Sequence, residues 1–150
     1  MNVLEASAIV GLVIATATIH AWGLFSLLRA LLVVVKRRSA TLTPAFTVRV
    51  LSTLTLASIV LHLVEVALWA VFYRTVAGFS DWRTALSFSL GSYSTVGAAV
   101  VTLPEEWRLL APLEAMTGAL MFGLSAAFLF TVLNEIHYHW RDSARRPAGS

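Results

Sequence analysis

Three long apolar runs constrain the fold of this chain more than any other feature. They cover residues 6–35, 45–73 and 112–134. Each run is long enough to cross a bilayer, because a helix needs roughly 20 residues to span the hydrocarbon core. With 58% hydrophobic and 13% charged residues, the chain has too few polar side chains to cover its apolar surface in water. The sequence therefore predicts an all-α integral membrane protein with three spanning helices.

The first run is expected to be a retained helix and not a cleaved signal. A secretory signal begins with basic residues, whereas the leader MNVLEAS carries Glu5 and no Lys or Arg. The chain also contains no cysteine, which excludes disulfides, thiolate metal sites and a cysteine nucleophile.

Basic residues cluster beside the apolar runs and predict the orientation in the membrane. They flank the first connection and follow the last run: Lys36, Arg37, Arg38, Arg49, Arg141, Arg145 and Arg146. The positive-inside rule places both regions in the cytoplasm, and three spans then place the N-terminus outside. This distribution explains the pI near 10.0 without a nucleic-acid partner. The tail from residue 136 is expected to be cytoplasmic and frayed.

The connection between the second and third runs contains a helix that is too short to span. Its segment WRTALSFSLGSY is apolar and compatible with a helix, and Ser80 or Asp81 is a candidate N-cap. A helix over residues 82–94 would be only about 20 Å long. The β-branched stretch STVGAAVVTLP that follows indicates an extended segment. A short helix and an extended segment with both ends outside predict a re-entrant loop.

A re-entrant loop needs protein around it. Non-helical backbone at membrane depth is tolerated only where protein buries it or where it lines a watery cavity. One chain with three helices can hardly enclose such a loop, whereas an oligomer can. The loop therefore suggests a pore that several subunits share.

The stretch SFSLGSYSTVGAAVVTLP resembles the pore signature of tetrameric potassium channels, in which a pore helix leads into the filter TVGYG. Over residues 55–134 the chain is similar to small bacterial ion-channel domain proteins that have one extra N-terminal helix. The matching residues are His62, Glu65, Trp69, Ala70, Tyr73, Thr95, Val96, Gly97, Trp107, Arg108 and Leu109. The resemblance implies a homotetramer in a bacterial plasma membrane, in contact with lipid. It also implies a permeant monovalent cation, potassium by default, and no resident cofactor.

The ion filter is assigned by this resemblance to Thr95, Val96, Gly97, Ala98 and Ala99. Ala98 and Ala99 replace the tyrosine and second glycine of the family filter, and Val100 replaces the acidic residue that follows. The expected function is passive cation conduction with altered or weak selectivity. The alternative is a non-conducting structural or regulatory membrane subunit with a vestigial pore loop, which could assemble with a channel partner whose filter is intact.

Other candidates have two interpretations each. His62, Glu65, Trp69 and Tyr73 are assigned to filter support. Glu65 is favoured as an anchor that bonds to loop backbone or to an arginine, and ion or proton handling is the alternative. His20 has no neighbour at ligand spacing in the sequence and is interpreted as a packed or interfacial residue, so no metal site is expected.

Two glycines and two histidines complete the candidate residues. Gly118 and Gly123 serve either as a gating hinge or for close helix packing. His137 and His139 are interpreted as interfacial anchors in preference to metal ligands. No catalytic constellation is present in the sequence, and an enzyme is the least supported reading.

The predicted domain organisation has three parts. Residues 1–44 form the N-terminal helix and connection, residues 45–135 the pore domain, and residues 136–150 the basic tail. Within the pore domain we predict an outer helix at 45–73, a pore helix at 82–94, the filter at 95–100 and an inner helix at 112–134.

Overall fold

The computed structural model describes residues 3–37, 43–97 and 101–145 and is helical throughout its regular parts. The elements are α1 (Val3–Arg37), α2 (Pro44–Thr75), α3 (Trp82–Tyr93), the short 3-10 helix η1 (Glu105–Trp107) and α4 (Leu110–Arg145). The described residues contain no β-strand. Three segments are long and apolar enough to cross a membrane, namely Glu5–Val34, Pro44–Thr75 and Glu105–Tyr138. The all-α fold with three candidate spans is confirmed.

Polar caps determine where α2 and α3 begin. The Thr43 hydroxyl accepts a hydrogen bond from the Phe46 amide at 3.2 Å, and Pro44 occupies the first turn, where a missing N–H costs nothing. The Asp81 carboxylate accepts from the Thr84 amide at 2.9 Å and from the Thr84 hydroxyl at 2.8 Å. Of the two expected caps for the pore helix, Asp81 is therefore the one used.

The expected end of the last helix was wrong. We predicted an inner helix at 112–134 and a frayed tail from residue 136, but α4 continues to Arg145. Residues 136–145 contain no glycine or proline, and the next helix breaker is Pro147. Basic residues near the C-terminus of a helix also interact favourably with its dipole.

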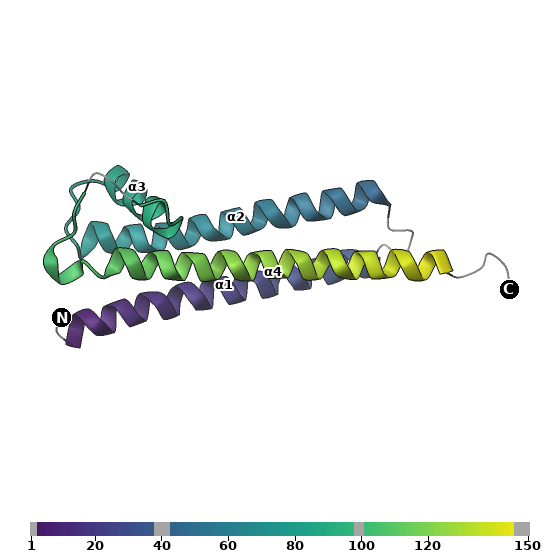
Figure 1. Ribbon diagram of the computed structural model, residues 1–150, viewed down its shortest axis with the longest axis horizontal. Helices are drawn as coiled ribbons and strands as arrows, with labels where there is room; N and C mark the ends of the chain where they lie inside the picture. Colours follow the sequence, from purple (N-terminus) through teal and green to yellow (C-terminus); the bar gives the residue numbers. More distant parts are fainter. Residues whose placement is uncertain (1–2, 38–42, 98–100, 146–150) are drawn as a thin grey trace.

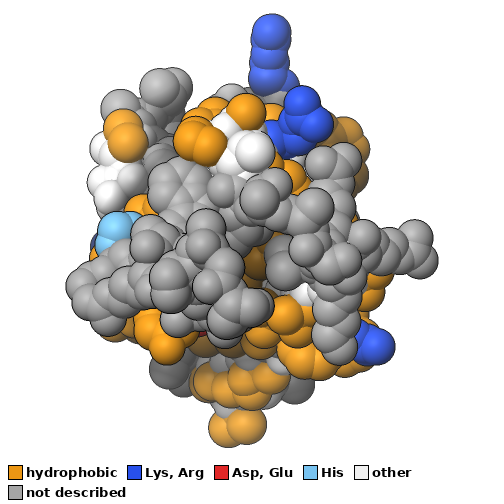
Figure 2. Space-filling model, turned by 90° about the vertical axis from the view of Figure 1, so that its right-hand side faces the viewer, with side chains coloured by type: hydrophobic (Ala, Val, Ile, Leu, Met, Phe, Trp, Pro, Cys, Tyr) orange, Lys and Arg blue, Asp and Glu red, His pale blue; other side chains and the backbone are white. Residues whose placement is uncertain are grey.

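The three long helices lie side by side, and α3 packs on α2 and α4 at the end of the molecule that carries the N-terminus (Figure 1). The C-terminal ends of α1 and α4 and the N-terminal end of α2 lie at the opposite end. In the end-on view of that side, Lys and Arg side chains project at the edge of a largely hydrophobic described surface (Figure 2).

The main core lies beneath α3. Its aromatic centre is Tyr73, Phe79 and Phe88, whose ring centroids lie 4.9 to 5.6 Å apart. Trp69 and Leu110 extend the same cluster and are fully buried. A second cluster, Val50, Leu54, Val132 and Ile136, joins α2 to α4 near the other end. Packing against this core therefore stabilises α3, because a helix this short is not stable in isolation.

Candidate functional site

The segment Thr95–Gly97 turns directly out of the C-terminus of α3. Thr95 has φ 63° and Gly97 has φ 87°, so two left-handed residues flank Val96. The left-handed conformation is costly for a residue with a Cβ and is readily adopted only by glycine. Gly97 therefore fits its position, whereas Thr95 must be held there by its surroundings.

Backbone hydrogen bonds hold this turn against α3. The Thr95 amide donates to the Ser92 carbonyl at 3.0 Å, and the Gly97 amide donates to the Gly91 carbonyl at 2.9 Å. Among the described residues, no backbone amide donates to the carbonyl of Thr95 or Val96. The amides thus point toward the helix, and the side chain of Val96 is 84% exposed in the single chain.

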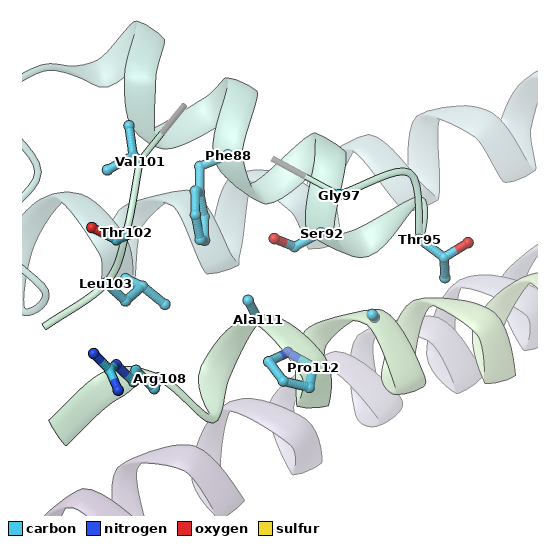
Figure 3. Close-up of a pocket in the computed structure, with 11 residues that line it drawn as sticks. Phe88, Ser92, Thr95, Gly97, Val101, Thr102, Leu103, Arg108, Ala111 and Pro112 are labelled. Atoms are coloured by element: carbon cyan, nitrogen blue, oxygen red, sulfur yellow. The ribbon is translucent and has the colours of Figure 1, made fainter. Parts of the chain in front are cut away.

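A cavity of about 530 Å³ separates this turn from the start of α4 (Figure 3). Its lining comes from three regions: Phe88 and Ser92 of α3, the returning segment 101–103, and the N-terminal part of α4 with Ala111 and Pro112. Thr95 and Gly97 contribute to the same lining. The backbone of the turn is therefore not packed directly against α4 on this side.

Glu65 anchors the end of α3 through a side chain. The Tyr93 hydroxyl donates to Glu65 Oε2, and both residues are buried. We expected Glu65 to bond to loop backbone or to an arginine, and the bonds found instead go to tyrosine and histidine side chains. Tyr93 lies two residues before Thr95, so this bond ties α2 to the base of the candidate filter. The site assignment of Glu65 is consistent with this geometry.

His20 is fully buried, and it lies beside polar side chains that its spacing in the sequence did not reveal. His20 Nδ1 lies 2.9 Å from Glu65 Oε1, and His62 Nδ1 lies 3.0 Å from the Tyr93 hydroxyl. Ser125 Oγ lies 3.4 Å from His20 Nε2 and 3.2 Å from His62 Nε2. These five side chains form a closed, buried ring, here called the polar ring, to which all four α-helices contribute.

Glu114 is a functional candidate that the sequence interpretation missed. Its Oε2 accepts a hydrogen bond from the Tyr73 hydroxyl at 2.7 Å, and its Oε1 accepts from the Ser89 hydroxyl at 2.6 Å. Ser89 also lies 2.8 Å from the Val66 carbonyl. A carboxylate inside an apolar run is by itself a signal of function, and this signal was available in the sequence. Glu114 of α4 thus links Tyr73 of α2 to Ser89 of α3.

Trp69 supports the bundle in a different direction. Its Nε1–H donates to the Thr16 hydroxyl at 2.9 Å, and Thr16 in turn donates to the Leu12 carbonyl at 2.9 Å. Trp69 and Thr16 are fully buried. Of the four assigned support residues, Trp69 and Glu65 therefore contact α1, and His62, Glu65 and Tyr73 connect α2 to α3 or α4.

Gly118 and Gly123 differ in their surroundings. A methyl group at Gly118 would overlap the Tyr93 carbonyl oxygen and lie 3.0 Å from the carbonyl carbon, whereas one at Gly123 would meet nothing within 4 Å. Close packing against the end of α3 therefore accounts for Gly118. It does not account for Gly123, and the hinge prediction is untested for both.

The remaining assigned residues are Ala98, Ala99, His137 and His139. Ala98 and Ala99, with Val100, lie outside the described residues, and so does the His139 side chain. His137 is exposed on α4.

The comparisons with known proteins agree with these observations. The sequence model of a family described as ion channel matches residues 59–135, which is half of the chain. No curated protein and no solved structure matches the chain.

Proposed function

This chain belongs to the ion channel family, and we propose that it is a passive, potassium-type cation channel whose pore is formed by four copies. Its three apolar spans make it an integral membrane protein. In this proposal the backbone of Thr95, Val96 and Gly97 lines the narrow part of the pore, and α4 lines the rest.

One observation carries the proposal, namely the backbone of the segment that follows α3. Left-handed residues flank Val96, and the amides of Thr95 and Gly97 bond back to α3. Rings of carbonyl oxygens can replace the hydration shell of a dehydrated cation. The C-terminus of α3 adds a partial negative charge near the same place. Both effects favour a cation.

The surfaces that a single chain leaves exposed support the assembly of several copies. Val96 is 84% exposed, and α4 exposes a stripe of side chains one helical turn apart, Met116, Leu120 and Leu124. Non-helical backbone at membrane depth needs protein or a watery cavity around it. Copies of the same chain arranged around an axis would surround this backbone with protein and enclose a watery cavity. The match to the family further supports this assembly.

The second half of the filter predicts weak discrimination between potassium and sodium. Ala98 lacks the aromatic ring, Ala99 lacks the conformational freedom of glycine, and Val100 lacks the negative charge of the family pattern. An alanine in a left-handed conformation costs about 1–2 kcal/mol per subunit. We propose a bacterial plasma membrane location with the N-terminus outside, because the basic residues gather at the opposite end.

Flux through liposomes tests the proposal. Purified protein should release potassium faster than protein-free vesicles of the same lipid. The variant Ala98→Tyr, Ala99→Gly, Val100→Asp should conduct with higher preference for potassium over sodium. If both proteins are silent, the channel proposal is wrong. A silent wild type with a conducting variant would favour the alternative, a non-conducting subunit with a degenerate filter.

A further inference from the structure

The polar ring described above lies outside the proposed conduction path, which uses the backbone of Thr95, Val96 and Gly97. It consists of His20 from α1, His62 and Glu65 from α2, Tyr93 from α3 and Ser125 from α4. Its members are buried, and two imidazoles and a carboxylate meet inside an apolar bundle. Ionisable groups at such a place are costly and are by default functional. The Tyr93–Glu65 hydrogen bond that anchors the end of α3 involves neither histidine, so the two histidines need a further explanation.

We propose that His20, His62 and Glu65 bind one divalent first-row metal ion per chain, with Zn²⁺ as the preferred ion. One ligand atom from each of the three residues lies within 4.8 Å of the other two. Glu65 Oε1 lies 2.9 Å from His20 Nδ1, and Glu65 Oε2 lies 3.4 Å from His62 Nδ1. Ligands at about 2.0–2.2 Å from a tetrahedral zinc ion are separated by similar distances. The widest separation among the three ligand atoms, up to 4.8 Å, must shorten when the ion binds, and rotation of the side chains can supply this change.

The chemistry of the three ligands selects the class of metal. Imidazole nitrogen suits zinc and the neighbouring transition metals, whereas calcium and magnesium prefer all-oxygen sites. Two histidines and one glutamate are an established zinc ligand set that leaves a fourth position open. Both imidazoles present Nδ1 toward Glu65. Coordination through Nδ1 requires the hydrogen of a neutral ring to be on Nε2.

Ser125 is placed to accept those Nε2 hydrogens. Its hydroxyl oxygen lies 3.2 Å from His62 Nε2 and 3.4 Å from His20 Nε2, and a hydroxyl oxygen has two lone pairs. Metal-binding histidines almost always donate their other N–H to an oxygen acceptor, usually a carboxylate, a backbone carbonyl or water, and carboxylate ligands are themselves hydrogen-bonded. The Tyr93 hydroxyl supplies the hydrogen bond to the carboxylate ligand by donating to Glu65. The supporting contacts of a metal site are thus already in place.

A count of hydrogens also favours a cation in the polar ring. Five close contacts join the side chains: His20–Glu65, Tyr93–Glu65, His62–Tyr93 and the two contacts of Ser125. With an ionised Glu65, two neutral imidazoles, one tyrosine and one serine supply only four hydrogens. When both imidazoles are neutral, one of the five contacts therefore has no hydrogen to form a hydrogen bond. A metal ion on the two Nδ1 atoms removes this shortage, because both Nε2 hydrogens then point to Ser125.

The site would connect the N-terminal helix to the pore domain. His20 is the ligand from α1, and Glu65 holds Tyr93 at the end of α3. Residues 59–135, which match the family, do not include α1. A bound ion would therefore fasten an element outside the matched region to the base of the candidate filter. The binding itself does not depend on whether the protein conducts.

Metal binding to the tag-free, EDTA-treated full chain in detergent tests the proposal. Zn²⁺ is titrated by calorimetry, and Co²⁺ is used as a spectroscopic probe of the ligands. We expect one ion per chain, a visible Co²⁺ absorption typical of a low-coordinate nitrogen and oxygen site, and its loss when Zn²⁺ is added. Because these measurements use the wild type, they do not depend on the folding of any variant. Absence of stoichiometric binding would overturn the proposal and leave a proton as the cation of the polar ring.

Variants then locate the site. His20→Gln should weaken Zn²⁺ binding by at least the 10–100-fold that is typical even for loss of a supporting residue, and Ser125→Ala by about 10–100-fold. His137→Gln removes an exposed histidine of α4 and is the matched control, which should bind as the wild type does. Circular dichroism in EDTA checks that each variant is folded. Equal binding by folded His20→Gln and wild type would refute the assignment.

Discussion

Replacing Gly118 by alanine should destabilise the protein, although alanine is the better helix former. The added methyl group would overlap the Tyr93 carbonyl oxygen and lie 3.0 Å from its carbon and 3.1 Å from Tyr93 Cδ1. Because two of these atoms are backbone, no side-chain rotation relieves the overlap, and α3 must move away from α4. Overpacking costs typically 1–3 kcal/mol, and we take the upper end. Alanine also gains about 1 kcal/mol over glycine in helix propensity. Subtracting this gain leaves a net destabilisation of about 2 kcal/mol.

Gly123→Ala provides a matched control on the same helix. A methyl group there meets no atom within 4 Å, so the helix-propensity gain of about 0.5–1 kcal/mol should appear without a packing cost. The assay is thermal or denaturant unfolding in one detergent, followed by circular dichroism. If Gly118→Ala is as stable as Gly123→Ala, close packing of α3 on α4 is not the reason for Gly118. Equal effects of both variants on flux, with no difference in stability, would favour the hinge.

Two further predictions concern the elements that hold α3. Tyr73→Phe keeps the aromatic packing but removes the hydroxyl that donates to buried Glu114, and it should cost about 1–3 kcal/mol of unfolding free energy, measured by denaturant titration. Hydrogen bonds from Thr84 lower the pKa of Asp81 below the ordinary value of an aspartate. The stabilisation of α3 by this charge is therefore present above that ordinary value and is lost as the pH falls through the lowered pKa. Asp81→Asn keeps a capping oxygen without this titration, so its stability difference from the wild type, followed by unfolding against pH, should vanish in acid. A difference that stays constant with pH would contradict this explanation.

The sequence predicted the features that depend on short stretches of chain. Run length and hydropathy sufficed for the three spans, because a bilayer requires about 20 apolar residues whatever the neighbours are. The beginning of α3 at Trp82 followed from a local capping signal, since Asp81 bonds to a residue only three positions away. The end of α4 was predicted less well. Polar and charged residues after an apolar span continue a helix unless a proline or glycine interrupts it.

The contacts of the candidate site could not be predicted in the same way. His20 meets Glu65 across 45 residues, and Tyr73 meets Glu114 across 41, so both pairs depend on how the helices rotate against one another. Gly118 and Gly123 occur in similar sequence surroundings, and only the approach of the Tyr93 backbone distinguishes them. Helix periodicity indicates which residues share a face, but it does not indicate which helix packs against that face.

A current measurement on purified wild-type protein in a planar bilayer tests the central claim most directly. With potassium chloride on one side and sodium chloride on the other, we predict a cation current through a pore lined by Thr95, Val96 and Gly97. Its reversal potential should shift in the direction that favours potassium, by less than for a filter with the complete TVGYG sequence. A bilayer with inserted protein that shows no current above the lipid background, or a reversal potential that favours sodium over potassium, would contradict the account.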